Sequence, residues 1–79
     1  MNVIIVEDDP MVSQLNGQYL SQVEGVHVAA RFANGRDALE YLKDNPVELA
    51  VMDVYMPMMN GLELLRAIRG AGIQTAVIM

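Results

Sequence analysis

Short apolar runs alternate with amphipathic segments along the whole chain. The runs are rich in β-branched residues, which is typical of buried strands. In order they are Asn2–Val6, Val26–Ala33, Val47–Val54 and Thr75–Met79. The third run is near-continuous rather than alternating, as expected of a strand covered on both faces. In the second run the apolar residues alternate, which puts on one side Val26, Val28, Ala30 and Phe32.

The segments between the runs repeat apolar residues every three or four positions, a period that predicts helices. Each begins with a side chain that can cap free amides: Asp9 before Pro10, Asn34 with Asp37 three residues on, and Asn60 with Glu63 three residues on. The predicted helix ends are Gly25, the pair Asn45-Pro46, and Gly70 with Gly72. The first helix carries one apolar stripe, formed by Val12, Leu15, Tyr19 and Val23.

The resulting order, β-α-β-α-β-α-β, predicts an α/β fold in which helices connect parallel strands. In such folds the working site lies at the carboxyl ends of the strands. Four acids fall at the ends of the first and third strands, namely Glu7, Asp8, Asp9 and Asp53. Concentrated negative charge at one edge of a sheet favours a cation or a basic surface on a partner.

Composition narrows the class of protein. The chain has 79 residues, which suits one small domain, and 53% of them are hydrophobic, enough for a core. No cysteine is present, so disulfides and thiolate chemistry are excluded. The net charge of −5 argues against direct contact with nucleic acid. With no signal peptide and no apolar run long enough to span a bilayer, we expect a cytoplasmic protein without membrane contact.

Two motifs carry a resemblance to a known family. The strand ending in VEDD and the later DVYMPMMNG resemble the receiver domain of bacterial two-component response regulators. The segment EDDPMVSQLNGQYL is similar to the first-helix region of regulators paired with citrate- and C4-dicarboxylate-sensing kinases. The resemblance covers the whole chain. It implies a flavodoxin-like, doubly wound parallel sheet of order 2-1-3-4-5, of which residues 1–79 would form the N-terminal two-thirds.

The resemblance also implies roles for the acids. Asp53 would accept a phosphoryl group from a sensor histidine kinase, since a carboxylate attacks phosphorus once charge repulsion is relieved. Asp8 would bind Mg²⁺ directly and Glu7 mainly through water. The backbone carbonyl of Tyr55 would complete the protein's share of the ligands, in keeping with the preference of Mg²⁺ for oxygen. Regulation of an attached DNA-binding output domain is the implied outcome.

Residues around the acids have plainer expected roles. Asp9, before a proline, is predicted to be a helix cap rather than a ligand. Pro57 shapes the loop after Asp53, and Gly61 either lets the backbone approach the site or merely permits a turn. His27 is expected at the surface. The methionines of the loop are expected to anchor it by packing, and they are Met56, Met58 and Met59.

The family pattern also requires a Ser or Thr after the fourth strand and a Lys at the end of a fifth, and neither is in the chain. We therefore expect weak magnesium binding and impaired phosphorylation of these 79 residues. Thr75–Met79 would form an apolar edge strand beside a bare sheet face, so self-association or poor folding is expected.

Two other functions fit parts of the pattern. A phosphorylation-silent interaction module would keep the fold without the chemistry, although the acid set Glu7, Asp8 and Asp53 argues against it. A phosphohydrolase with an aspartyl nucleophile would need a second acid two residues later, where this chain has Tyr55.

Overall fold

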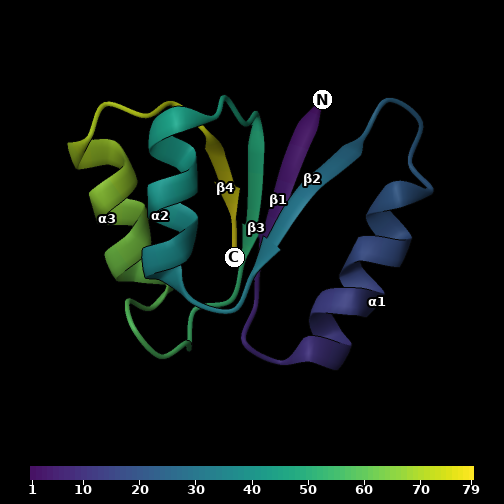
Figure 1. Cartoon of the computed structure of the whole chain (residues 1–79), viewed down its shortest axis with the longest axis horizontal. Coiled ribbons are helices and arrows are strands. Elements are labelled where there is room, and N and C mark those ends of the chain that lie inside the picture. The colour runs from purple at the N-terminus through teal and green to yellow at the C-terminus, as the bar shows by residue number, and fades with distance from the viewer.

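The computed structural model describes all residues, 1–79, as a four-stranded parallel sheet of order β2-β1-β3-β4 with three helices. The elements are β1 (Asn2–Val6), α1 (Pro10–Ser21), β2 (His27–Phe32), α2 (Gly35–Asp44), β3 (Leu49–Met52), α3 (Gly61–Gly70) and β4 (Ala76–Ile78). With the sheet seen nearly edge-on, α1 lies on one side and α2 and α3 lie on the other (Figure 1). The predicted α/β fold and element order are confirmed.

The strands are shorter than the apolar runs that predicted them. β1 has only five residues, and Val3 to Val6 pair with Leu49 to Met52. Because a strand extends only as far as its neighbour's ladder, β3 is confined to four residues, and the predicted run Val47–Val54 was too long. Val47 is still buried in the core, and its carbonyl accepts a hydrogen bond from the Thr75 hydroxyl at 2.8 Å.

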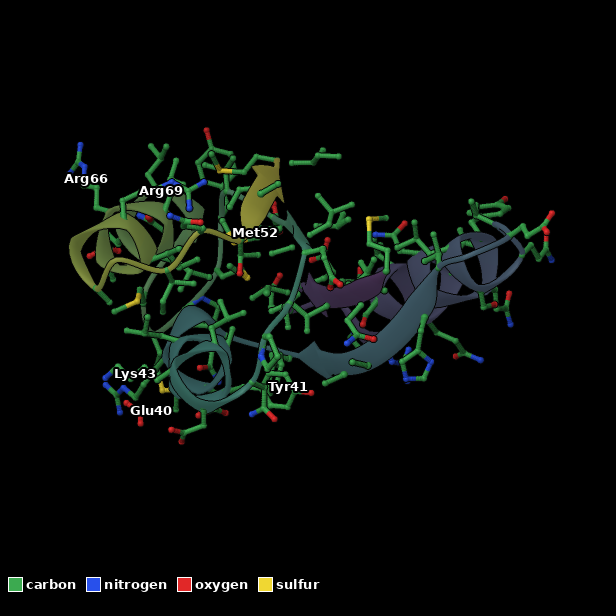
Figure 2. All side chains as sticks on the ribbon, turned by 90° about the horizontal axis from the view of Figure 1, so that it is seen from above. Glu40, Tyr41, Lys43, Met52, Arg66 and Arg69 are labelled. Atoms are coloured by element: carbon green, nitrogen blue, oxygen red, sulfur yellow. The ribbon has the colours of Figure 1, made fainter.

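The main core fills the space between the sheet and the pair α2 and α3. It consists of Ile4, Val6, Ala38, Leu42, Val47, Ala50, Met52, Leu64 and Ile68. Figure 2 shows the labelled Tyr41 between α2 and β2, where its ring lies 5.3 Å from that of Phe32. At the far end of α3, Arg69 donates to the carbonyls of Ile73 and Thr75 at 3.0 and 2.8 Å and so ties α3 to β4.

The opposite face of the sheet is only partly covered. Val3 and Ile5 of β1 are fully buried there, but Leu49 and Val51 of β3 are half-buried, so β3 is not covered on both faces as predicted. The predicted apolar stripe of α1 is exposed in the structure, at Val12, Leu15, Tyr19 and Val23. Ser13 is the one fully buried residue of α1. This helix therefore leaves most of its apolar surface in contact with solvent.

A register shift in β2 overturns the predicted alternation. Val3 pairs with Val28 but Ile4 pairs with Ala30, so one residue of β2 is left over. Such a bulge reverses the face on which the following side chains lie. Ala30 and Phe32 pack against the main core, whereas Val28 lines a groove beside α1. The prediction that all of these residues share one side was therefore wrong.

The helix starts follow the predicted caps. The side chains of Asp9, Asn34 and Asn60 accept hydrogen bonds from the first-turn amides of α1, α2 and α3. Asn60 and Glu63 form a full capping box. Gly25 does not end α1, which stops at Ser21; instead it takes a φ of +83° in the turn before β2.

Candidate functional site

Three carboxylates meet at the carboxyl edge of the two central strands. Glu7 and Asp8 follow β1 directly, and Asp53 follows β3. One carboxylate oxygen from each lies within 4.8 Å of the others. The strands position them closely because the ladder continues past its last regular pair: the Asp53 amide donates to the Val6 carbonyl at 2.9 Å. Likewise the Glu7 amide donates to the Phe32 carbonyl at 2.9 Å.

The fourth acid of the sequence pattern serves a different purpose. The Oδ1 of Asp9 accepts hydrogen bonds from the amides of Met11 and Val12 at 2.9 and 3.3 Å. Asp9 is therefore the N-cap of α1, and its amide in turn donates to Oε2 of Glu7 at 3.2 Å. Capping of this kind is worth about 1 kcal/mol. It also fixes the start of α1 beside the acid cluster.

The crowding of carboxylates perturbs Glu7. Partial burial raises the pKa of its carboxyl above the ordinary value of 4.5, and the neighbouring Asp8 and the charge of Asp53 raise it further. The hydrogen bond from the Asp9 amide opposes this shift by stabilising the charged form. Burial is the main cause of the raised pKa of Glu7, and the neighbouring acids add to it.

The loop from Asp53 to α3 folds back tightly on its own start. The Tyr55 amide donates to Oδ1 of Asp53 at 3.3 Å, and the Tyr55 side chain is exposed. The Gly61 amide donates to the Val54 carbonyl at 2.9 Å. A Cβ on Gly61 would lie 2.5 Å from the carbonyl oxygen of Asp53. Of the two readings of Gly61, close approach of the backbone to the site is the correct one. Pro57 is exposed within this loop.

The methionines of the loop adopt an unusual backbone conformation. Met58 and Met59 are the two non-glycine residues with positive φ, at +50° and +80°. Met56 and Met59 pack against the main core, as predicted for loop anchors, whereas Met58 is exposed. His27 is exposed, as expected.

One residue of this region was missed by sequence reasoning. Asn34 is predicted as the cap of a helix, but no role is predicted for Gly35, which is buried against Met59 of the loop. A glycine directly after the predicted cap Asn34 was the available signal, but the residue against which it packs could not be deduced from local pattern.

The acid cluster also opens onto a pocket of about 460 Å³ between α1 and the end of β2. Its lining includes Glu7, Asp8, Ser13 and Arg31. Arg31 is the one cationic side chain of that lining, and Ser13 is its buried polar residue. This pocket makes Glu7 and Asp8 accessible from the side of α1.

The fold and the site together define a class of protein: an α/β domain with a carboxylate cluster at the carboxyl edge of a parallel sheet. A family model described as the response regulator receiver domain matches residues 3–79. The chain therefore belongs to the response regulator receiver domain family, and receiver domains are signalling modules.

Relatives of known name support the same assignment. The chain is 42% identical to the "Probable C4-dicarboxylate response regulator DctR" of Priestia megaterium, over 96% of this chain and 33% of that protein. It is 43% identical to the transcriptional regulatory protein MalR of Bacillus subtilis, over 100% of this chain and 34% of that protein. The chain thus spans about a third of the length of the curated relatives it matches.

Solved structures show the same architecture. The response regulator domain of Thermotoga maritima CheB superposes with a TM-score of 0.92 at 25% identity, covering 100% of this chain and 58% of that one. A DNA-binding response regulator of the LuxR family from Staphylococcus aureus gives 0.89 at 30% identity, covering 96% and 63%. No helix in the chain is both long and apolar enough to cross a lipid bilayer.

Proposed function

We propose that the chain is a phospho-accepting switch in which Asp53 receives a phosphoryl group from a sensor histidine kinase. The observation that carries this proposal is the meeting of Glu7, Asp8 and Asp53 at one edge of the sheet, within 4.8 Å, in a chain of the receiver family. Asp53 is half-buried and reachable, and its Oδ1 is oriented by the Tyr55 amide.

The transfer itself balances without an acid or base from the chain. A carboxylate oxygen of Asp53 forms a bond to phosphorus while the bond from phosphorus to the donor nitrogen or oxygen breaks. The leaving atom takes the electron pair, and an acyl phosphate remains on Asp53. Asp9 is unsuited to this role because Oδ1 of its carboxylate is held by two helix amides. The position two residues after Asp53 holds Tyr55, so no acid stands there to hydrolyse the product.

The same cluster suits Mg²⁺. Its donors are all carboxylate oxygens, and ligand oxygens of an octahedral Mg²⁺ at about 2.1 Å lie roughly 3 to 4 Å apart. The oxygens of Glu7, Asp8 and Asp53, within 4.8 Å, need only a small closure or an intervening water. We assign Asp8, Asp53 and the Tyr55 carbonyl as direct ligands, with Glu7 acting through water. A bound Mg²⁺ would offset the charge on Asp53 and on the transferred group. Pro57 and Gly61 hold the loop that bears the Tyr55 carbonyl.

The wider role rests on the relatives. DctR is named as a C4-dicarboxylate response regulator and MalR as a transcriptional regulatory protein. We assign the chain to the same subfamily, regulating transcription through a DNA-binding domain outside residues 1–79. The stimulus would act on this chain through the sensor histidine kinase.

The test is phosphorylation of a full-length protein, in which residues 1–79 are joined to the rest of the domain and the proposed output domain, with Mg²⁺ and acetyl phosphate. It is followed by mass spectrometry and by acid and base treatment. The expected product is an acid-stable, base-labile adduct of one phosphoryl group, present in the wild type and absent from Asp53→Asn. Asp44→Asn, an equal change of charge at the end of α2, should keep the adduct. No adduct on the wild type would mean a phosphorylation-silent module, and rapid turnover of phosphate esters would mean a phosphohydrolase.

We also propose that the isolated 79-residue chain self-associates. The apolar stripe of α1 is exposed, β4 forms an open edge, and Ile78 on that strand is 55% exposed. Exposed apolar side chains and an open strand edge each favour association. Sedimentation should show species larger than the monomer, which the double variant Leu15→Glu, Tyr19→Glu reduces. A stable, cooperatively folding wild-type monomer would contradict this.

A further inference from the structure

The loop between β3 and α3 is held at two points, and only one of them lies at the acid cluster. At the cluster, Gly61 packs against the carbonyl of Asp53. The second point is the first turn of α2, where the Arg36 amide donates to the Met58 carbonyl at 3.3 Å. The start of α2 and this loop lie together at the carboxyl edge of the sheet (Figure 1).

Gly35 makes the second contact possible. It is buried, and a Cβ at this position would overlap the carbonyl oxygen of Met59. The same Cβ would lie 3.1 Å from both Cβ and Cγ of Met59, tighter than ordinary van der Waals contact. The φ of Gly35 is not positive, so glycine is required here for space rather than for backbone conformation.

The contact holds a loop that would otherwise relax. Left-handed backbone costs roughly 1–2 kcal/mol for a residue with a Cβ, and Met58 and Met59 both adopt it. Such strain persists only where the surroundings enforce it. The packing of Met59 on the core and on Gly35, with the Arg36 amide on Met58, supplies that constraint.

We infer that Gly35 is a positioning residue for the metal and phosphoryl site: through Met59 it sets the path of the loop that carries Tyr55. This inference rests on the proposed function of Asp53. The loop has only seven residues, 54–60, between the acceptor and α3. The start of the loop is fixed at Asp53, which follows β3 and contacts Gly61. Only Asn60 separates Met59 from Gly61, so a shift of Met59 must be absorbed mainly between Asp53 and Met59, where the Tyr55 amide and carbonyl lie. Gly35 contacts none of the acids itself.

The test compares Mg²⁺ affinity among variants of the full-length protein that contains residues 1–79. Titration is followed by the NMR shifts of the Asp53 and Tyr55 amides, and stability is measured in parallel by urea unfolding. Gly35→Ala should weaken Mg²⁺ binding about ten-fold, the scale typical of residues that orient ligands. The amide of Tyr55 should also shift before any Mg²⁺ is added.

Two further variants keep the test decisive if Gly35→Ala does not fold. Met59→Ala removes Cγ from the contact while keeping a Cβ, and should weaken Mg²⁺ binding several-fold. Met58→Ala is its matched control: the neighbouring residue has the same left-handed backbone but an exposed side chain, so its affinity should stay at the wild-type value. Ala38→Gly, in the buried face of α2, supplies a stability control that leaves the Gly35–Met59 contact intact.

The possible outcomes distinguish a failure of this inference from a failure of the proposed function. A wild type that binds no Mg²⁺ would refute the proposed site. A wild type that binds Mg²⁺, with Gly35→Ala and Met59→Ala binding equally well, would overturn only the role of Gly35. Equal loss of affinity in Ala38→Gly and in Met59→Ala would also overturn it, since the effect would then follow stability alone.

Discussion

Replacing Asp53 with asparagine should stabilise the metal-free chain. The variant removes one of three negative charges, while its Oδ1 can still accept the hydrogen bond from the Tyr55 amide. At the outer separation of 4.8 Å, one like-charge pair costs about 0.9 kcal/mol at the dielectric constant of water. Physiological salt reduces this to roughly half. Loss of the pairs with Glu7 and Asp8 therefore gives about 1 kcal/mol.

The assay is thermal and urea unfolding of wild type and Asp53→Asn in the presence of a chelator. A gain of about 1 kcal/mol corresponds to roughly 4–8 °C in Tm for a domain of this size. The gain should grow as salt is lowered, because its origin is repulsion between partly exposed charges. Glu24→Gln, in the turn at the opposite end of the sheet, makes the same change of net charge and should have little effect.

Added Mg²⁺ should make the wild type more stable than Asp53→Asn. Mg²⁺ at ten times its Kd stabilises the wild type by about 1.4 kcal/mol, while the variant, lacking one ligand, gains less. The reasoning fails if Asp53→Asn is no more stable than the wild type without Mg²⁺, or if the difference between them is independent of ionic strength. Either result would mean that the carboxylates do not repel one another in the folded chain.

Three other perturbations follow from the site and its supports. Gly61→Ala should destabilise by roughly 1–3 kcal/mol, because its Cβ would lie 2.5 Å from the Asp53 carbonyl oxygen; Gly70→Ala, with open space around it, should not destabilise in the same urea titration. Asn60→Ala should cost about 1 kcal/mol through loss of the capping box, seen as a lower urea midpoint; an unchanged midpoint would contradict the cap. Because the folded chain raises the pKa of Glu7, its stabilising contribution is present at acidic pH and lost as pH rises through the folded value. As pH rises above the ordinary Glu pKa of 4.5, the stability of the metal-free wild type should therefore fall relative to that of Glu7→Gln, and a difference that stays constant with pH would refute this.

The position of the acid cluster could be predicted from sequence because it depends on topology alone. Once helices connect parallel strands, the residues that follow β1 and β3 must emerge at the same edge. That reasoning needs no side-chain detail, and it brought Glu7, Asp8 and Asp53 together correctly. The caps were equally local, since Asp9 and Asn60 act on amides two or three residues away.

Features that depend on contacts distant in sequence could not be deduced in this way. The bulge between Val28 and Ala30 is a matter of register with β1, and nothing in the alternation of β2 reveals it. The exposure of the α1 stripe depends on what the remaining sheet face packs against. The contact of Gly35 with Met59 joins residues 24 positions apart, and two left-handed methionines contradict local preference.

The central place of β1 has a consequence for how the site can move. Its residues Val3 to Val6 are fully buried and paired on both sides, so their amides belong to the last part of the chain to exchange with solvent. Glu7 and Asp8 are attached directly to this slow-opening strand. The loop after Asp53 has few such bonds, so we expect it to open at a lower free energy than the sheet. Any rearrangement caused by phosphorylation of Asp53 should therefore be confined to the loop that follows it, while Glu7 and Asp8 keep their positions.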